Sequence, residues 1–139
     1  MKKVILGGVF ILIILVGLAS YADMTKEPIS ESNLSDLKGK WEGWRSITKG
    51  DFSTELEIDN DTLPLKGKFT FHDVVAGRIK KSGTNTMDFE NGKIKDNNFY
   101  LKLGGSYFEL SLHKGDGKMK FKGEFNHRGA KGTMTLDKK

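Results

Sequence analysis

The sequence predicts an all-β protein: a small antiparallel up-and-down β-barrel of about 8–10 strands, preceded by a signal peptide and one short helical turn. Three observations support this prediction. Apolar and polar residues alternate with a period of two through most of the chain, and short turn sequences separate the alternating runs. Glycine is abundant, with 17 residues against 2 prolines, which suits tight turns and strand bends. A flattened β-sandwich is the alternative architecture.

The chain opens with the features of an export signal. Lys2 and Lys3 precede an apolar run over residues 4–19, and Ser20-Tyr21-Ala22 offers small residues at the positions that a signal peptidase reads. We therefore expect a signal peptide over residues 1–22 and a protein that is secreted or lies in the periplasm or cell envelope. The alternative is an uncleaved membrane anchor over residues 4–19, although a helix of that length rises only about 24 Å, short of the roughly 30 Å hydrocarbon core.

The rest of the chain divides into a tether and a barrel domain. Residues 23–32 are polar and aperiodic, which predicts a flexible tether, and the β-barrel domain is expected over residues 33–139. Residues 33–37 resemble one or two helical turns that end at Gly39. Strands are expected from residue 40 and over residues 52–58, 65–71, 74–80, 85–90, 92–95, 99–103, 108–112, 119–125 and 132–136. Turns are expected at residues 59–61, 82–83, 90–92, 96–97, 104–105 and 115–117.

The segment Leu37-Lys38-Gly39-Lys40-Trp41 resembles the start of lipocalins and related calycin barrels, including fatty-acid-binding proteins. In those proteins a short helical turn precedes Gly-x-Trp at the opening of the first strand. The resemblance implies that Gly39 and Trp41 are structural, that the tryptophan closes one end of the barrel and that the cavity takes small apolar ligands. The Gly-Lys-apolar triplets at residues 39, 67, 92 and 117 are also similar to uncharacterised small β domains that many bacteria export.

Large apolar side chains are expected to point into the barrel, because alternate residues of a strand share a face. The candidate ligand-binding residues are Trp41, Phe69, Phe108, Phe121 and Phe125. Inward positions also hold glycines, which suits strands that bend at barrel corners: Gly43, Gly67, Gly123 and Gly132. A barrel of about eight strands is either filled by its own side chains or holds one small ligand. A filled core with binding at the rim or outer face is favoured, and a lipocalin-like carrier of a small apolar ligand is the alternative.

Lys118, Lys120 and Lys122 share one outward face and are the candidate cationic surface residues, suited to an anionic lipid or wall polymer of the envelope. Outward lysines also keep sheet edges soluble, and this second interpretation stays open. The formal charge is +5, or +3 once Lys2 and Lys3 are removed, well below that of a nucleic-acid binder. The expected partners are a small apolar ligand or an anionic envelope component. No nucleic acid is expected, and a membrane only if the N-terminal segment is retained.

No motif in the sequence indicates catalysis. The chain has no cysteine, so zinc-thiolate sites and thiol nucleophiles are excluded. His72, His113 and His127 have no spacing that indicates a metal site, and the acidic residues lie on polar strand faces or in turns. No Ser-His-Asp arrangement, nucleophile elbow or phosphate loop is present. The sequence therefore predicts a protein that is not an enzyme and that uses no cofactor and no metal.

Overall fold

The computed structural model describes residues 24–48, 50–72, 74–75, 78–79 and 84–139. The predicted signal peptide over residues 1–22 and the predicted turn at residues 82–83 lie outside this part of the chain. The elements within it, in chain order, are β1 (Thr25–Glu27), η1 (Glu31–Asp36, a 3-10 helix), β2 (Gly39–Ile47), β3 (Gly50–Ile58), β4 (Leu65–Phe71), β5 (Val74–Val75), β6 (Arg78–Ile79), β7 (Asn85–Lys95), β8 (Asn98–Leu103), β9 (Ser106–Gly115), β10 (Lys118–His127) and β11 (Ala130–Lys138).

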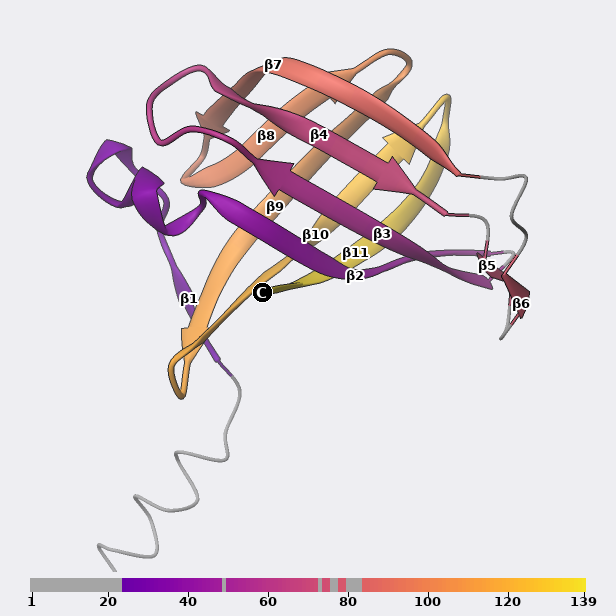
Figure 1. Cartoon of the computed structure of the whole chain (residues 1–139), viewed down its shortest axis with the longest axis horizontal. Helices are drawn as coiled ribbons and strands as arrows, with labels where there is room; N and C mark the ends of the chain where they lie inside the picture. The colour runs from indigo at the N-terminus through magenta and orange to yellow at the C-terminus, as the bar shows by residue number, and fades with distance from the viewer. Residues whose placement is uncertain (1–23, 49, 73, 76–77, 80–83) are drawn as a thin grey trace, which may run out of the picture.

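Eight strands close into an antiparallel barrel (Figure 1). Around the barrel they follow chain order, β2-β3-β4-β7-β8-β9-β10-β11, and β11 pairs with β2 to complete the circle. Short turns join most of these consecutive strands, whereas the β5–β6 hairpin lies in the chain between β4 and β7. Closure pairs the sheet's edges with each other while burying its apolar face. The predicted up-and-down barrel is therefore confirmed, in preference to the flattened sandwich.

The two ends of the barrel differ. We call the end that holds η1 and the turn at residues 96–97 the closed end. The opposite end, which holds the turns at residues 104–105 and 128–129, is the mouth. In Figure 1 the closed end is on the side of η1, and the mouth is on the side of the small β5–β6 hairpin.

Trp41 fills the closed end. It occupies an inward position of β2 and is fully buried, with its ring centroid 4.1 Å from that of Phe121. Its indole Nε1 donates a hydrogen bond to the carbonyl oxygen of Leu37 at 2.9 Å. The Nζ of Lys138 lies 5.7 Å from the centroid of the indole ring and donates a hydrogen bond to the carbonyl oxygen of Asp36 at 2.5 Å. The tryptophan on β2 thus contacts the segment around η1 and residues of β10 and β11.

The short helix is found where it is predicted, with its bounds shifted towards the N-terminus. Leu34 is buried and Leu37, which follows the helix, is fully buried, so its apolar side covers the closed end. Lys114 of β9 donates to Asp36 at 2.5 Å and to Glu27 at 3.2 Å. The hydrogen bond to Asp36 is the main cause that raises the pKa of Lys114 above its ordinary value. None of the helices in the described ranges is long and apolar enough to cross a membrane.

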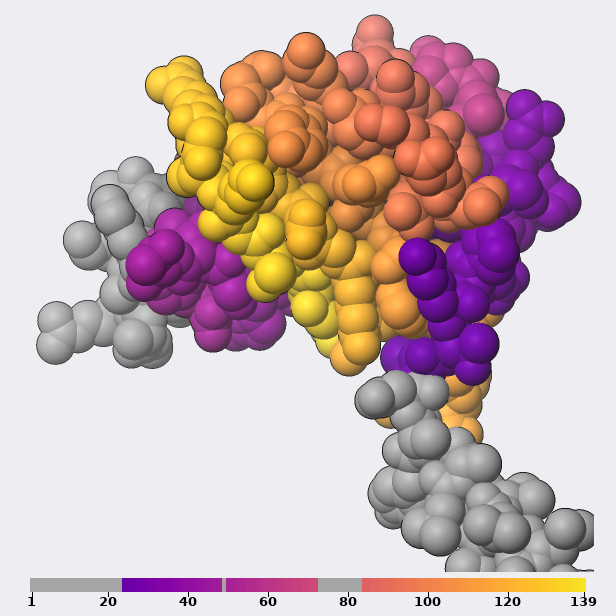
Figure 2. Space-filling model, turned by 180° about the vertical axis from the view of Figure 1, so that it is seen from behind, coloured from indigo at the N-terminus to yellow at the C-terminus, as the bar shows by residue number. Residues whose placement is uncertain are grey.

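Residues 24–32 belong to the folded barrel, which corrects the prediction of a flexible tether over residues 23–32. Strand β1 pairs antiparallel with the last part of β9, and Ile29 is fully buried. The backbone N–H of Ile29 also donates to the carbonyl oxygen of Asn97 at 2.9 Å. Pairing between β8 and β9 stops at Leu110, so the last residues of β9 have backbone groups available for another strand. Figure 2 shows the indigo residues of this segment lying against the orange β9 region.

Two local predictions, one of a turn and one of a strand, are wrong. The turn predicted at residues 90–92 is absent, and β7 runs through it with one extra residue opposite β4, between Leu65 and Gly67. Asn91 lies in this bulge, and its side-chain amide donates a hydrogen bond to the carbonyl oxygen of Lys102 at 2.8 Å. The polar side chain therefore links β7 to β8 and does not mark a turn. The single strand predicted over residues 74–80 is instead two short strands, β5 and β6, which pair with each other.

Aromatic rings fill the interior of the barrel from the closed end to the middle of the barrel. The ring of Phe69 lies 4.8 Å from that of Phe108 and 6.1 Å from that of Phe89. The ring of Phe99 lies 5.9 Å from that of Phe121. Phe69, Phe99 and Phe121 have no exposed surface. Rings at these separations are in contact, so side chains fill this part of the barrel.

Candidate functional site

A pocket of about 420 Å³ lies at the mouth of the barrel. Its floor is apolar and is formed by Phe71, Met87, Leu103, Phe108 and Phe125. The volume falls within the range of roughly 300–1,000 Å³ that is usual for sites of small molecules. The floor closes the pocket above the packed interior, so a ligand in it would sit at the rim of the barrel.

The floor is built from stacked phenylalanine rings. The ring centroids of Phe71 and Phe108 lie 5.9 Å apart, with an angle of 15° between the ring planes. Those of Phe108 and Phe125 lie 6.2 Å apart, with an angle of 27°. The three residues come from β4, β9 and β10 and are all buried. Their positions in the core hold the rings in place, so the floor is preformed.

Arg45 lies at the edge of this floor. It follows Trp41 by four residues on β2, so it points to the inside of the barrel as Trp41 does. Its guanidinium carbon lies 4.7 Å from the centroid of the Phe71 ring and 5.2 Å from that of Phe52. Contacts of this kind between a cation and aromatic faces are favourable and orient the guanidinium plane.

Arg128, His127 and Ser106 lie on two hairpin ends that are hydrogen-bonded to each other. The backbone N–H of Arg128, in the β10–β11 turn, donates to the carbonyl oxygen of Gly105 in the β8–β9 turn at 3.1 Å. Beside this bond, Ser106 and His127 face each other in register and are hydrogen-bonded through Oγ and Nδ1. The Arg128 side chain passes over Gly105, where an added Cβ would lie 3.1 Å from its Cγ. These contacts place Arg128 and His127 at the pocket.

The charged groups in the described lining of the pocket are basic. Its described lining includes the guanidinium groups of Arg45 and Arg128 and the imidazole of His127, and it includes no aspartate or glutamate. Asn85 and Ser106 add neutral polar groups. Within the described ranges, Arg128 makes no ion pair. The pocket therefore combines an apolar floor with a cationic rim.

The candidate ligand-binding residues separate into two groups. Phe108 and Phe125 line the mouth pocket. Trp41, Phe69 and Phe121 lie in the packed interior with no exposed surface.

Sequence reasoning missed the cationic rim. The alternation that buries Trp41 also places Arg45 on the inward face of β2, and the same rule places His127 on the inward face of β10. A charged or titratable residue at an inward position near a strand end was therefore a usable signal. Arg128 lies in a turn with a φ of 51°, and no periodicity indicated its position.

The row of candidate surface cations lies on the outside of β10. Lys118, Lys120 and Lys122 alternate with inward residues, as expected, and Lys120 lies opposite His113 on one side and Asp137 on the other. The Nζ of Lys120 forms an ion pair with Asp137 at 3.4 Å, which offsets part of the positive charge of the row. Recognition of an anionic envelope component by this row stays a prediction.

His113 lies on the outer surface beside this row, and its Nε2 is hydrogen-bonded to the Oγ of Ser111 at 2.9 Å. Burial is the main cause that lowers its pKa below the usual value, and the charge of Lys122 lowers it further. A hydrogen bond with the backbone of Met24 acts in the opposite direction and does not cancel these effects.

The lowered pKa of His113 predicts a pH-dependent stability. The unfolded chain binds a proton at this residue at a higher pH than the folded chain does, so the free energy of unfolding is expected to decrease as the pH falls through about 6.5. His113→Gln removes the titrating group and is expected to reduce this slope. Urea denaturation of both proteins between about pH 8 and pH 5 measures the difference. Identical slopes would contradict the assigned cause.

Among the described residues, no group of three or more histidine, aspartate or glutamate side chains is arranged to hold a metal ion. The three histidines also lie apart in the fold, because His72 bonds to Glu55 on β3, His113 to Ser111 on β9 and His127 to Ser106 at the mouth.

No protein-family model matches the chain, and no curated protein or solved structure is significantly similar to it. The fold and the site define its class: a small, closed, antiparallel β-barrel with an apolar pocket and a cationic rim at one end. A shared architecture does not determine a ligand, so the function is argued from the mouth pocket.

Proposed function

We propose that this chain is an exported, non-enzymatic small β-barrel protein that binds a small ligand at the rim of its barrel. The observation that carries the proposal is the mouth pocket, in which a preformed apolar floor meets a few oriented polar groups. This combination is typical of sites for small molecules. Because aromatic rings fill the interior below the floor, binding at the mouth is favoured over the deep interior site of the lipocalin-like alternative.

Two features support a relation to lipocalin-like and calycin barrels. A short helix precedes Gly39 and the fully buried Trp41, which fills the closed end as the resemblance implies. The eight antiparallel strands then follow in chain order. Export is proposed from the sequence of residues 1–22, with its two lysines, apolar run and small residues before Asp23.

A substitution that fills the pocket tests the proposal. Met87→Trp adds a large side chain at an inward position of β7, whereas Thr86→Trp places the same side chain on the outward face of the same strand. The two probes are 8-anilinonaphthalene-1-sulfonate and its uncharged parent N-phenyl-1-naphthylamine, whose emission increases in apolar surroundings. Saturable binding of at least one probe is expected, with a dissociation constant raised about tenfold or more by Met87→Trp, equal to about 1.4 kcal/mol.

The control variant Thr86→Trp is expected to bind as the unchanged protein does. Because such probes also bind partly folded states, the near-ultraviolet circular dichroism of each variant must match that of the original protein. Absence of saturable binding of both probes, or equal effects of the two substitutions, would overturn the proposed rim site.

A further inference from the structure

The basic and polar groups of the mouth lie around its apolar floor. Arg45 extends from β2, and His127 and Arg128 extend from the β10–β11 hairpin, while the stacked rings of Phe71 and Phe108 belong to the floor. A ligand that fills the pocket therefore meets two different surfaces, one apolar and one positively charged.

On the basis of the proposed function, we infer that the mouth pocket selects small organic anions: molecules with an apolar body for the phenylalanine floor and a carboxylate or sulfonate group for the guanidinium of Arg128. Complementarity of charge supports this inference, because the described lining carries cations and no carboxylate. An uncharged apolar ligand would cover the floor but would gain nothing from the rim. An inorganic anion would reach the rim but would leave the rings of the floor exposed to water.

Arg128 is suited to hold the anionic group. Its backbone is held by the hydrogen bond to Gly105, so the side chain starts from a defined position at the pocket. Guanidinium groups bind carboxylates through two parallel hydrogen bonds, and such charge-assisted bonds are stronger than neutral ones. Arg45 lies on β2, the strand that pairs with β11, and is stacked on the Phe71 ring.

The two naphthylamine probes form a matched pair for testing this inference, since they share their rings and differ by the sulfonate group. In the unchanged protein, we expect the sulfonate probe to bind at least about tenfold more tightly than the uncharged one. Arg128→Gln is expected to reduce this ratio to about threefold or less while leaving the affinity for the uncharged probe within about twofold. The ratio is also expected to decrease as the salt concentration rises.

Lys131→Gln is the matched control. It removes one positive charge from the same hairpin, and Lys131 is exposed and does not line the mouth pocket, so the ratio is expected to stay near that of the unchanged protein. Equal binding of the two probes would overturn the anion preference and leave the proposed function standing. Equal loss in Arg128→Gln and Lys131→Gln would also overturn it, because net charge alone would then explain the ratio. Failure of both probes to bind would overturn the proposed function itself.

Discussion

Gly123→Ala is expected to unfold the barrel at room temperature. Gly123 lies at an inward position of β10, and a Cβ added there would lie 1.9 Å from the carbonyl oxygen of Glu109 and 2.9 Å from the Cα of Leu110. Both atoms belong to the backbone of β9, so the clash is relieved only if paired strands separate. We expect a loss of at least about 4 kcal/mol, close to the whole stability of a marginal domain. Far-ultraviolet circular dichroism and urea denaturation measure it.

Gly115→Ala is the control for this experiment. Gly115 lies at the end of the neighbouring strand β9, and an added Cβ would lie 3.2 Å from the Cγ and 3.3 Å from the Cα of Met24, contacts that a shift of a few tenths of an ångström relieves. Its cost is expected to stay within about 1 kcal/mol. Equal unfolding midpoints for the two variants would show that close approach of strands at Gly123 does not limit the barrel.

Trp41→Ala is expected to destabilise the protein by about 3–5 kcal/mol. The substitution removes a fully buried ring that contacts Phe121 and ends the hydrogen bond to Leu37, which helps to hold η1 on the closed end. The cavity left at the end of the barrel adds to the cost, because the paired strands around it are not free to collapse. Urea denaturation measures the change in the free energy of unfolding.

Trp44→Ala provides the matched comparison, because Trp44 lies three residues further along the same strand and is 50% exposed on the outside. We expect its effect to stay within about 0.5 kcal/mol. In Trp44→Phe the emission of Trp41 alone is observed, and it is expected at the shorter wavelengths of a buried indole. Similar losses from Trp41→Ala and Trp44→Ala would refute the role of Trp41 as the plug of the closed end.

Most of the barrel could be predicted from the sequence because each strand of the meander buries one face. The period of two in residues 118–127, for example, corresponds to β10 with Phe121 and Phe125 inside. Strand β1 could not be predicted in this way, since three paired residues are too few to show a period. The bulge at Asn91 was mistaken for a turn because bulges and turns use the same residue types.

The candidate site was only partly predictable. Periodicity identifies which residues point inwards, and so it places Phe108 and Phe125 inside the barrel. Periodicity does not show how far along the barrel the packed interior extends. That limit determines that Phe108 and Phe125 line a pocket and that Phe69 does not. That boundary depends on how the rings from β4, β9 and β10 meet, and Arg128 reaches it from a turn through a hydrogen bond between two hairpins.

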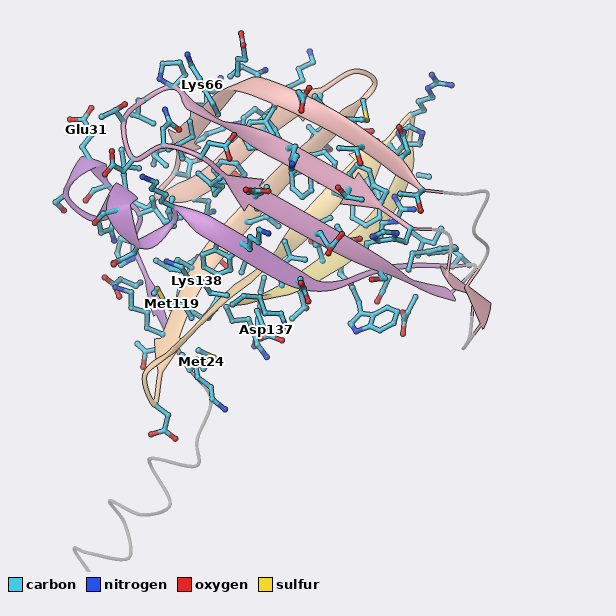
Figure 3. The ribbon with its side chains drawn as sticks, viewed as in Figure 1. Met24, Glu31, Lys66, Met119, Asp137 and Lys138 are labelled. Atoms are coloured by element: carbon cyan, nitrogen blue, oxygen red, sulfur yellow. The ribbon has the colours of Figure 1, made fainter. Side chains whose placement is uncertain are left out.

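The pairing of β1 with the last part of β9 also determines how the molecule faces its surroundings. The chain enters the fold at the closed end, and the backbone N–H of Lys139 donates to the carbonyl oxygen of Lys40 at that same end. Figure 3 shows Met24 and Lys138 on this side, away from the hairpin ends of the mouth. A fusion partner, an affinity tag or a covalent link to a solid support joined after Lys139 would therefore present the pocket outwards. Immobilised in this orientation, the barrel would leave its rim accessible to molecules in the bulk solution.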